Sequence, residues 1–130
     1  ITKGADYIST AVAVAPVTNW RYYDNIYTER FMRTPQENPS GYDDNSPINF
    51  VENLKGNYLL CHGSGDDNVH YQNAMELIRA LVYEGKQFDL MVYPDKDHGI
   101  YGNYEQEGLE VRMHLYEKIN NFLFENLLEK

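Results

Sequence analysis

Three short apolar runs along the chain have the length and composition of buried β-strands. They span Ala11–Ala15, Asn57–His62 and Phe88–Tyr93, and each is followed at once by a proline or a glycine. Periodicity cannot distinguish a short buried strand from a buried helical segment, so run length, residue type and the breakers that follow decide the assignment. These features predict three buried strands.

Apolar side chains at helical spacing mark the segments between and after these runs. Tyr71–Glu84 has the clearest amphipathic pattern, and Gly85 follows it where a helix end favours glycine. Trp20–Met32 is also predicted to be helical, with three aromatic side chains on one face, at Trp20, Tyr23 and Tyr27. A last helix is predicted over Glu107–Leu128, and its apolar stripe would consist of Leu109, Met113, Tyr116, Ile119, Leu123 and Leu127.

The segment Thr34–Asn53 is predicted to be a long loop, because it contains three prolines, a glycine and a cluster of Asp and Asn. Around it, predicted strands and helices alternate along the whole chain. This order is typical of the α/β class, in which helices flank a parallel sheet. Ligands bind such sheets outside the carboxyl ends of the strands, so chemistry is expected directly after Ala15, His62 and Tyr93.

Composition and charge exclude several classes of function. The chain has 130 residues, with 11 Lys and Arg against 20 Asp and Glu, which gives a net charge of −9. An acidic chain repels phosphate backbones and anionic lipid surfaces, so we expect no nucleic-acid partner and no membrane contact in this segment. The single cysteine, Cys61, excludes an intrachain disulfide. Twelve tyrosines are a compositional excess.

Acidic residues and a histidine follow the second and third predicted strands. Asp66 and Asp67 lie in the loop after the second strand, and His98 lies in the loop after the third. A carboxylate at this place can hold one imidazole nitrogen and stabilise the imidazolium, as in a nucleophile–histidine–acid triad. In α/β-hydrolases the triad order along the chain is nucleophile, acid, histidine, and the last two are present here in that order. Taken singly, an ordinary turn and a structural histidine would explain the same residues, and spacing alone does not separate Asp66 from Asp67.

Metal-ligand side chains occur in the same two loops, at His62, Asp66, Asp67 and His98. They are accompanied by no helical His-x-x-x-His pair and no cysteine pair, which are the spacings that favour a metal site. We therefore predict neither a metal site nor a cofactor.

Three segments of the chain match motifs of a known family: Val14–Arg30, Tyr58–His70 and Asp97–Ile100. They resemble the dipeptidyl peptidase branch of the prolyl oligopeptidase family, over nearly the whole chain and with the family's spacing between motifs. The motif His-Gly-x-x-Asp alone would indicate only some α/β-hydrolase. The block Trp-x-x-Tyr-x-x-x-Tyr, which begins at Trp20, is typical of this branch.

The resemblance implies a role for each matching residue. Asp66 corresponds to the aspartate of the catalytic triad and His98 to its histidine, with Asp67 as the alternative acid. Asn68 corresponds to a residue that hydrogen-bonds the substrate carbonyl. An aromatic slot suits the rigid, apolar proline side chain, and the slot would be lined by Val17, Trp20, Tyr23, Tyr27 and Val69.

The nucleophile of the triad has no counterpart in this sequence. The family's serine lies in a Gly-x-Ser-x-Gly-Gly elbow, whereas the stretch 63–65 is too short and follows the wrong strand. The chain also begins with Ile1 instead of Met. We therefore expect residues 1–130 to be the C-terminal portion of an α/β-hydrolase peptidase domain, without the serine elbow or the β-propeller, and inactive by itself.

For the parent protein, the resemblance implies a serine exopeptidase that releases N-terminal dipeptides ending in proline or alanine. Its partners would be such peptides and a second copy of itself, bound through the hydrolase domain and its apolar last helix. A periplasmic or cell-surface location is also implied. The alternatives are another α/β-hydrolase (an acylaminoacyl peptidase, a prolyl oligopeptidase or an esterase) and a non-catalytic homologue used for binding or assembly.

Overall fold

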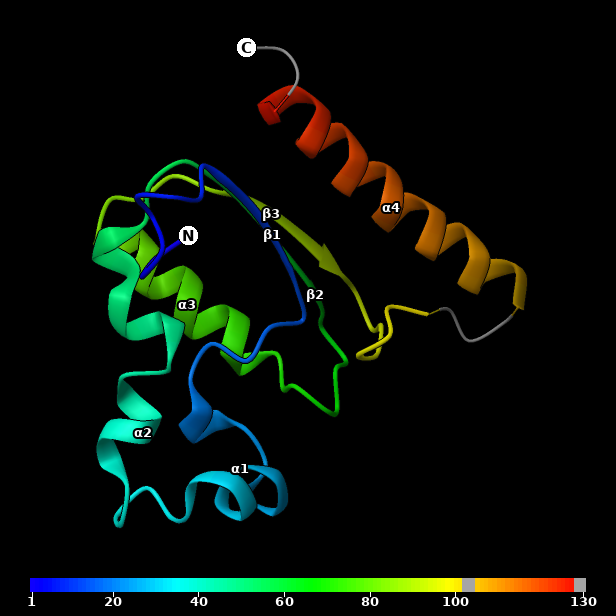
Figure 1. Cartoon of the computed structure of the whole chain (residues 1–130). Coiled ribbons are helices and arrows are strands. Elements are labelled where there is room, and N and C mark those ends of the chain that lie inside the picture. The colour runs from blue at the N-terminus through cyan, green and yellow to red at the C-terminus, as the bar shows by residue number, and fades with distance from the viewer. Residues whose placement is uncertain (102–104, 128–130) are drawn as a thin grey trace.

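The computed structural model describes residues 1–101 and 105–127 and contains a three-stranded parallel sheet (Figure 1). Its strands are β1 (Thr10–Val14), β2 (Asn57–Gly63) and β3 (Asp89–Tyr93), in the order β1-β2-β3. The three predicted strands and the α/β class are therefore confirmed, with each strand boundary within one residue of its prediction. The helical segments are η1 (Trp20–Tyr22), α1 (Asn25–Met32), α2 (Pro39–Asp43), η2 (Pro47–Asn53), α3 (Gln72–Tyr83) and α4 (Glu105–Leu127).

The central strand β2 is buried because its side chains enter two hydrophobic cores in alternation. Leu60 packs with Leu81 of α3 on one face of the sheet, and Leu59 packs with Phe122 of α4 on the other. Figure 1 shows these two helices on opposite sides of the sheet. Helices on both faces explain why β2 is a continuous apolar run, as expected for a covered parallel sheet.

Parallel pairing brings the carboxyl ends of all three strands to one edge of the sheet. Gly63 at the end of β2 is the register partner of Tyr93 at the end of β3. Helix α1 lies beyond this edge (Figure 1). The loops that follow β2 and β3 are therefore neighbours, which is where the sequence predicts chemistry.

The prediction of one continuous helix over Trp20–Met32 is wrong in one respect, because the structure divides this segment into two helical pieces. The short 3₁₀ turn η1 is followed by Tyr23 in an extended conformation and by Asp24, the N-cap of α1. The Asp24 carboxylate accepts a hydrogen bond from the Tyr27 N–H at 2.9 Å. A carboxylate that caps the next turn is favoured at a helix start, so Asp24 begins a new helix where periodicity predicts a continuous one.

The prediction that Thr34–Asn53 is a long loop is also wrong, because this segment contains the short helices α2 and η2. Pro39 and Pro47 lie in the first turn of these helices, where the missing proline N–H leaves no helical bond unmade. Asn38 caps α2 by accepting a hydrogen bond from the Gly41 N–H at 3.1 Å. The prolines mark helix starts here.

The apolar stripe predicted on the last helix lies largely on the outer face of α4. More than half of the surface is exposed at Leu109, Met113, Tyr116 and Leu127, while Ile119 and Leu123 are partly buried. The side chains fully buried against the sheet are instead Leu115 and Phe122. The helix has apolar residues on two faces, and periodicity does not say which face meets the sheet. Leu128, the last residue of the predicted helix, lies outside the described residues.

Among the described residues, no helix combines the length and the apolar composition that a bilayer span requires.

Replacing Asp24 tests the division of the predicted helix. We expect Asp24→Ala to lower the free energy of unfolding by about 1 kcal/mol, because the first turn of α1 loses its cap, and Asp24→Asn to lose much less. Urea denaturation followed by fluorescence of the single tryptophan measures the difference. Glu29→Ala, an exposed change inside the same helix, is the control, and an equal loss there would contradict the capping role.

Candidate active site

A buried aspartate meets a histidine where the loops after β2 and β3 come together. Asp66 Oδ2 lies 2.9 Å from His98 Nδ1. The Asp66 side chain is fully buried, while the His98 side chain is 41% exposed. A carboxylate oxygen only accepts hydrogen bonds, so Nδ1 carries the proton, and Nε2 of His98 is the nitrogen that can take a proton from a neighbouring group.

Backbone donors hold the other oxygen of the Asp66 carboxylate. Oδ1 accepts hydrogen bonds from the N–H groups of Asn68 and Val69, both at 2.9 Å. The local sequence accounts for this turn, since aspartate side chains readily bind backbone groups two residues further on. Asp67, the alternative acid, is exposed, and it is Asp66 that the structure brings to His98.

The turn that carries His98 lies directly against the end of β2. Gly65 N–H donates to Lys96 O at 3.1 Å. A Cβ atom at Gly63 would lie 2.3 Å from Lys96 O and 2.6 Å from Asp97 O, far inside contact distance. The close approach of the two backbones therefore requires glycine at position 63.

Two non-glycine residues with positive φ bracket His98: Asp95 at 58° and Ile100 at 53°. A positive φ is unusual for a β-branched residue such as Ile100, and such a residue keeps this conformation only where its surroundings enforce it. Ile100 is fully buried, and its N–H donates to Asp97 O at 3.0 Å. Core packing on one side of the turn thus fixes the position of His98 on the other.

Helix α4 supports the same turn through side chains that sequence reasoning missed. Arg112 Nη1 donates to Gly99 O at 2.6 Å, and its guanidinium lies 5.0 Å from the ring centroid of Tyr101. Lys96, at the start of the turn, pairs with Glu107. The signal for Arg112 is absent from the sequence, because a bond from a helix side chain to a distant loop carbonyl has no periodicity.

An aromatic cluster of Trp20, Tyr23, Tyr27 and Phe31 lies on η1, α1 and the link between them. Trp20 and Tyr27 stack with centroids 6.4 Å apart, and Tyr23 meets them edge-on at 6.2 and 5.5 Å. Phe31, which the sequence did not single out, lies 5.0 Å from Tyr27. The three predicted aromatic residues are therefore together despite the break in the helix.

Tyr23 links the aromatic cluster to the Asp66 loop. Its hydroxyl donates to Asn68 Oδ1 at 2.8 Å, and the Asn68 N–H in turn donates to Asp66. Partial burial raises the pKa of the Tyr23 hydroxyl above its ordinary value, and the nearby Asp24 carboxylate adds to the shift. The hydroxyl therefore stays protonated as a donor, and the aromatic cluster and the Asp66–His98 pair form one continuous site.

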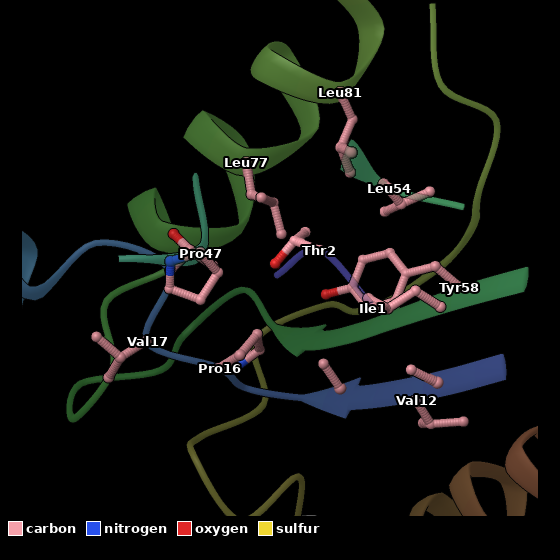
Figure 2. Close-up of a pocket in the computed structure, with 13 residues that line it drawn as sticks. Ile1, Thr2, Val12, Pro16, Val17, Pro47, Leu54, Tyr58, Leu77 and Leu81 are labelled. Carbon is pink, nitrogen blue, oxygen red and sulfur yellow. The ribbon is translucent and has the colours of Figure 1, made fainter. Parts of the chain in front are cut away.

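The remaining two predicted pocket residues are Val17 and Val69. Val17 lines an apolar cavity of about 220 Å³ between β1 and α3, which Leu77 and Leu81 also line (Figure 2). Val69 is buried, and it meets the site through its backbone, whose N–H binds Asp66 and whose carbonyl binds His62.

The described part of the chain holds no group of three or more His, Cys, Asp or Glu side chains arranged to bind a metal ion. His62, which the sequence suggested only as a metal ligand, is fully buried and lies 3.2 Å from Asp66 Oδ2. The arrangement around Asp66 and His98 is suited to proton transfer, because it combines a fixed acceptor carboxylate with an oriented and partly exposed imidazole.

Comparison with known proteins places this site in a family context. A model of the prolyl oligopeptidase family matches residues 1–128. A probable dipeptidyl-aminopeptidase B of Colletotrichum graminicola is 51% identical over 118 residues, which are 88% of this chain and 12% of that protein. A protein of the same description from Coccidioides posadasii is 56% identical over 93 residues, 69% of this chain and 10% of that protein. The chain thus spans roughly a tenth of the length of these relatives.

Solved structures give the same result for the fold. The crystal structure of Porphyromonas gingivalis dipeptidyl peptidase 4 matches with a TM-score of 0.89 and 48% identity, over 97% of this chain and 17% of that one. A putative dipeptidyl aminopeptidase IV from Bacteroides ovatus matches with a TM-score of 0.87 and 34% identity, with the same coverage. The parallel sheet and its flanking helices therefore match part of both structures.

Gly63→Ala tests the requirement for close approach. The added methyl group would force the Lys96 carbonyl away from β2, so we expect a stability loss of about 1–3 kcal/mol and an Asp66–His98 distance beyond hydrogen-bonding range. Denaturation and a crystal structure of the variant measure both effects. The control is Gly99→Ala in the same turn, whose Cβ would meet only the movable side chains of Tyr101 and Asp97. Equal effects in the two variants would contradict the argument.

Proposed function

The chain belongs to the prolyl oligopeptidase family, and on that premise we propose that its parent protein is a serine peptidase that removes dipeptides from peptide N-termini. The observation that carries the proposal is the joining of the Asp66–His98 pair to the aromatic cluster through Asn68 and Tyr23. Relatives described as dipeptidyl-aminopeptidases support it. Because the chain spans only a small part of those proteins, the rest of the parent would complete the site.

The proposed mechanism is acyl transfer through a Ser-Asp-His triad. A serine from elsewhere in the parent would attack the carbonyl that follows the second residue of the peptide. His98 Nε2 would take the serine proton and return it to the leaving amine. Asp66, held by the N–H groups of Asn68 and Val69, would keep the His98 Nδ1–H oriented and stabilise the imidazolium.

The domain assignment follows from which residues of the triad this chain contains. This chain supplies an acid and a base, and its sequence has no Gly-x-Ser-x-Gly elbow. We therefore propose that residues 1–130 form the C-terminal portion of the peptidase domain and do not cleave peptides by themselves.

The aromatic cluster and Asn68 support a preference for proline or alanine at the second position of the peptide. A proline ring is rigid and apolar and packs well against aromatic faces, and alanine is small enough for the same slot. Asn68 Oδ1 already accepts from the Tyr23 hydroxyl. The Asn68 amide group that remains is a donor, which is the group that a substrate carbonyl requires.

Activity of the full-length parent tests this function. We expect hydrolysis of Gly-Pro-p-nitroanilide and of the Gly-Ala analogue, and no hydrolysis of the N-acetylated forms, because a dipeptidyl peptidase requires a free amino terminus. Asp66→Asn should lose on the order of 10⁴-fold in kcat, since the His98 tautomer would no longer be fixed. Asp67→Asn, the exposed neighbour, is the matched control and should stay near the unmodified rate.

Other outcomes of this assay would support the alternative functions. Hydrolysis of blocked peptides would favour an acylaminoacyl peptidase or a prolyl oligopeptidase, and hydrolysis of esters alone would favour an esterase. Full activity in Asp66→Asn together with a large loss in Asp67→Asn would transfer the triad role to Asp67. A parent with no hydrolytic activity would be a non-catalytic homologue.

We also propose that the parent forms a homodimer through α4. The outer face of this helix exposes Leu109, Met113 and Tyr116, each by more than half of its surface. Burial of such a face against a second copy would remove apolar surface from water.

Met113→Glu tests the proposed dimer, because a charge at the centre of an apolar interface opposes association. We expect the sedimenting mass of the full-length protein to fall to that of one copy. Met75→Glu on α3, where the methionine is similarly exposed at 47%, is the control and should remain dimeric. A Met113→Glu protein that keeps the mass of the unmodified protein would rule α4 out as the interface.

A further inference from the structure

We propose that His62 is a positioning residue, which holds the Asp66 carboxylate and the loop around it in the orientation that His98 requires. The inference rests on the proposed function, because it concerns the same Asp66–His98 pair. It assigns a role to a buried histidine that the acyl-transfer mechanism does not otherwise use.

His62 lies directly behind the carboxylate. It is the last residue but one of β2, and its side chain is completely buried, as is that of Asp66. His62 Nε2 lies 2.8 Å from Val69 O and 3.2 Å from Asp66 Oδ2. The same Oδ2 atom lies 2.9 Å from His98 Nδ1. One carboxylate oxygen is thus placed between two histidines, of which one is buried and one faces solvent.

The surroundings of the His62 ring fix the position of its proton. Nδ1 is buried and has no hydrogen-bond partner among the described residues. A proton on Nδ1 would be a buried donor with nothing to bind, which is strongly unfavourable. The proton therefore lies on Nε2, where it faces the Val69 carbonyl and the Asp66 carboxylate. The ring meets Tyr71 edge-on at 5.5 Å, which limits its rotation.

His62 and Asp66 together bind both backbone polar groups of Val69, its carbonyl and its N–H. The Val69 carbonyl accepts from His62 Nε2 at 2.8 Å, and the Val69 N–H donates to Asp66 Oδ1 at 2.9 Å. The adjacent Asn68 N–H also binds Oδ1, and the Asn68 side chain binds Tyr23. A change at His62 would therefore displace the Asp66 carboxylate, which His62 contacts directly through Oδ2.

A positioning role differs measurably from a purely structural one. Asp66 acts most strongly when the imidazolium forms, so a misplaced carboxylate lowers kcat and leaves KM nearly unchanged. A purely structural defect lowers thermal stability, with little effect on kcat well below the melting temperature.

The experiment uses the full-length parent with His62→Gln and His62→Asn. A glutamine amide reaches the place of the imidazole Nε2, whereas an asparagine amide reaches only the place of Nδ1. We expect His62→Asn to lose on the order of 10²-fold in kcat with little change in KM, as for a small misplacement of a catalytic group. His62→Gln should restore most of the rate. If His62→Asn does not fold, His62→Leu provides the same comparison with His62→Gln.

Leu60→Ala is the matched control for stability. Leu60 is fully buried in the same strand, two residues before His62 and therefore on the same face of the sheet. We expect this variant to melt at a lower temperature and to keep its kcat at 25 °C. A His62→Asn protein with unchanged kcat, or a His62→Gln protein no faster than His62→Asn, would overturn the proposal.

A fluorophosphonate that labels an activated serine separates this proposal from the proposed function. If the unmodified parent is labelled but does not cleave Gly-Pro-p-nitroanilide, the substrate assignment fails. The labelling rates of the Gln and Asn variants then still decide the role of His62 in the same way. If the unmodified parent is not labelled at all, the triad is absent and both proposals are overturned together.

Discussion

The site depends on two backbones being able to touch at the end of β2. Parallel pairing places Gly63 beside Tyr93, but it leaves the following loops free to diverge. Because residue 63 is a glycine, the carbonyl oxygen of Lys96 can lie only 2.3 Å from the position that a Cβ atom of residue 63 would occupy. Only with this approach do Asp66 and His98, on separate loops, come within 2.9 Å of each other. The sheet thus brings the two loops to the same edge, and the absence of a side chain at Gly63 lets Asp66 and His98 come into contact.

Asp66 combines the folding of its loop with the chemistry of the site. A buried carboxylate is strongly unfavourable unless hydrogen bonds compensate for the lost water. Here the compensation comes from two backbone N–H groups, from His98 and from the nearby His62. The donors that shape the loop are therefore the same donors that keep the carboxylate in place. A satisfied polar network of this kind is rigid, which is what an oriented base requires.

The sequence predicted the strands and the place of Asp66 and His98, because strand runs are local and parallel sheets collect ligand-binding groups at one edge. It did not predict the role of Arg112, whose bond to Gly99 joins a helix to a loop without any periodic trace. It predicted the apolar stripe of α4 but not which face of the helix meets the sheet, since that helix is apolar on two faces. The break at Asp24 was missed because the aromatic spacing continues across it. Tertiary contacts, and not local pattern, decide these three features.

For the proposed peptidase, the connection from Tyr23 through Asn68 to Asp66 means that substrate binding and base orientation are not independent. Asn68 would contact the substrate, and its own N–H holds the carboxylate that orients His98. A side chain that fills the aromatic cluster poorly would leave Tyr23 free to move and would loosen this loop. Interactions that tighten only when the correct substrate is bound raise kcat as well as affinity. Discrimination between proline and larger residues would therefore be expressed in the rate of acyl transfer more than in binding.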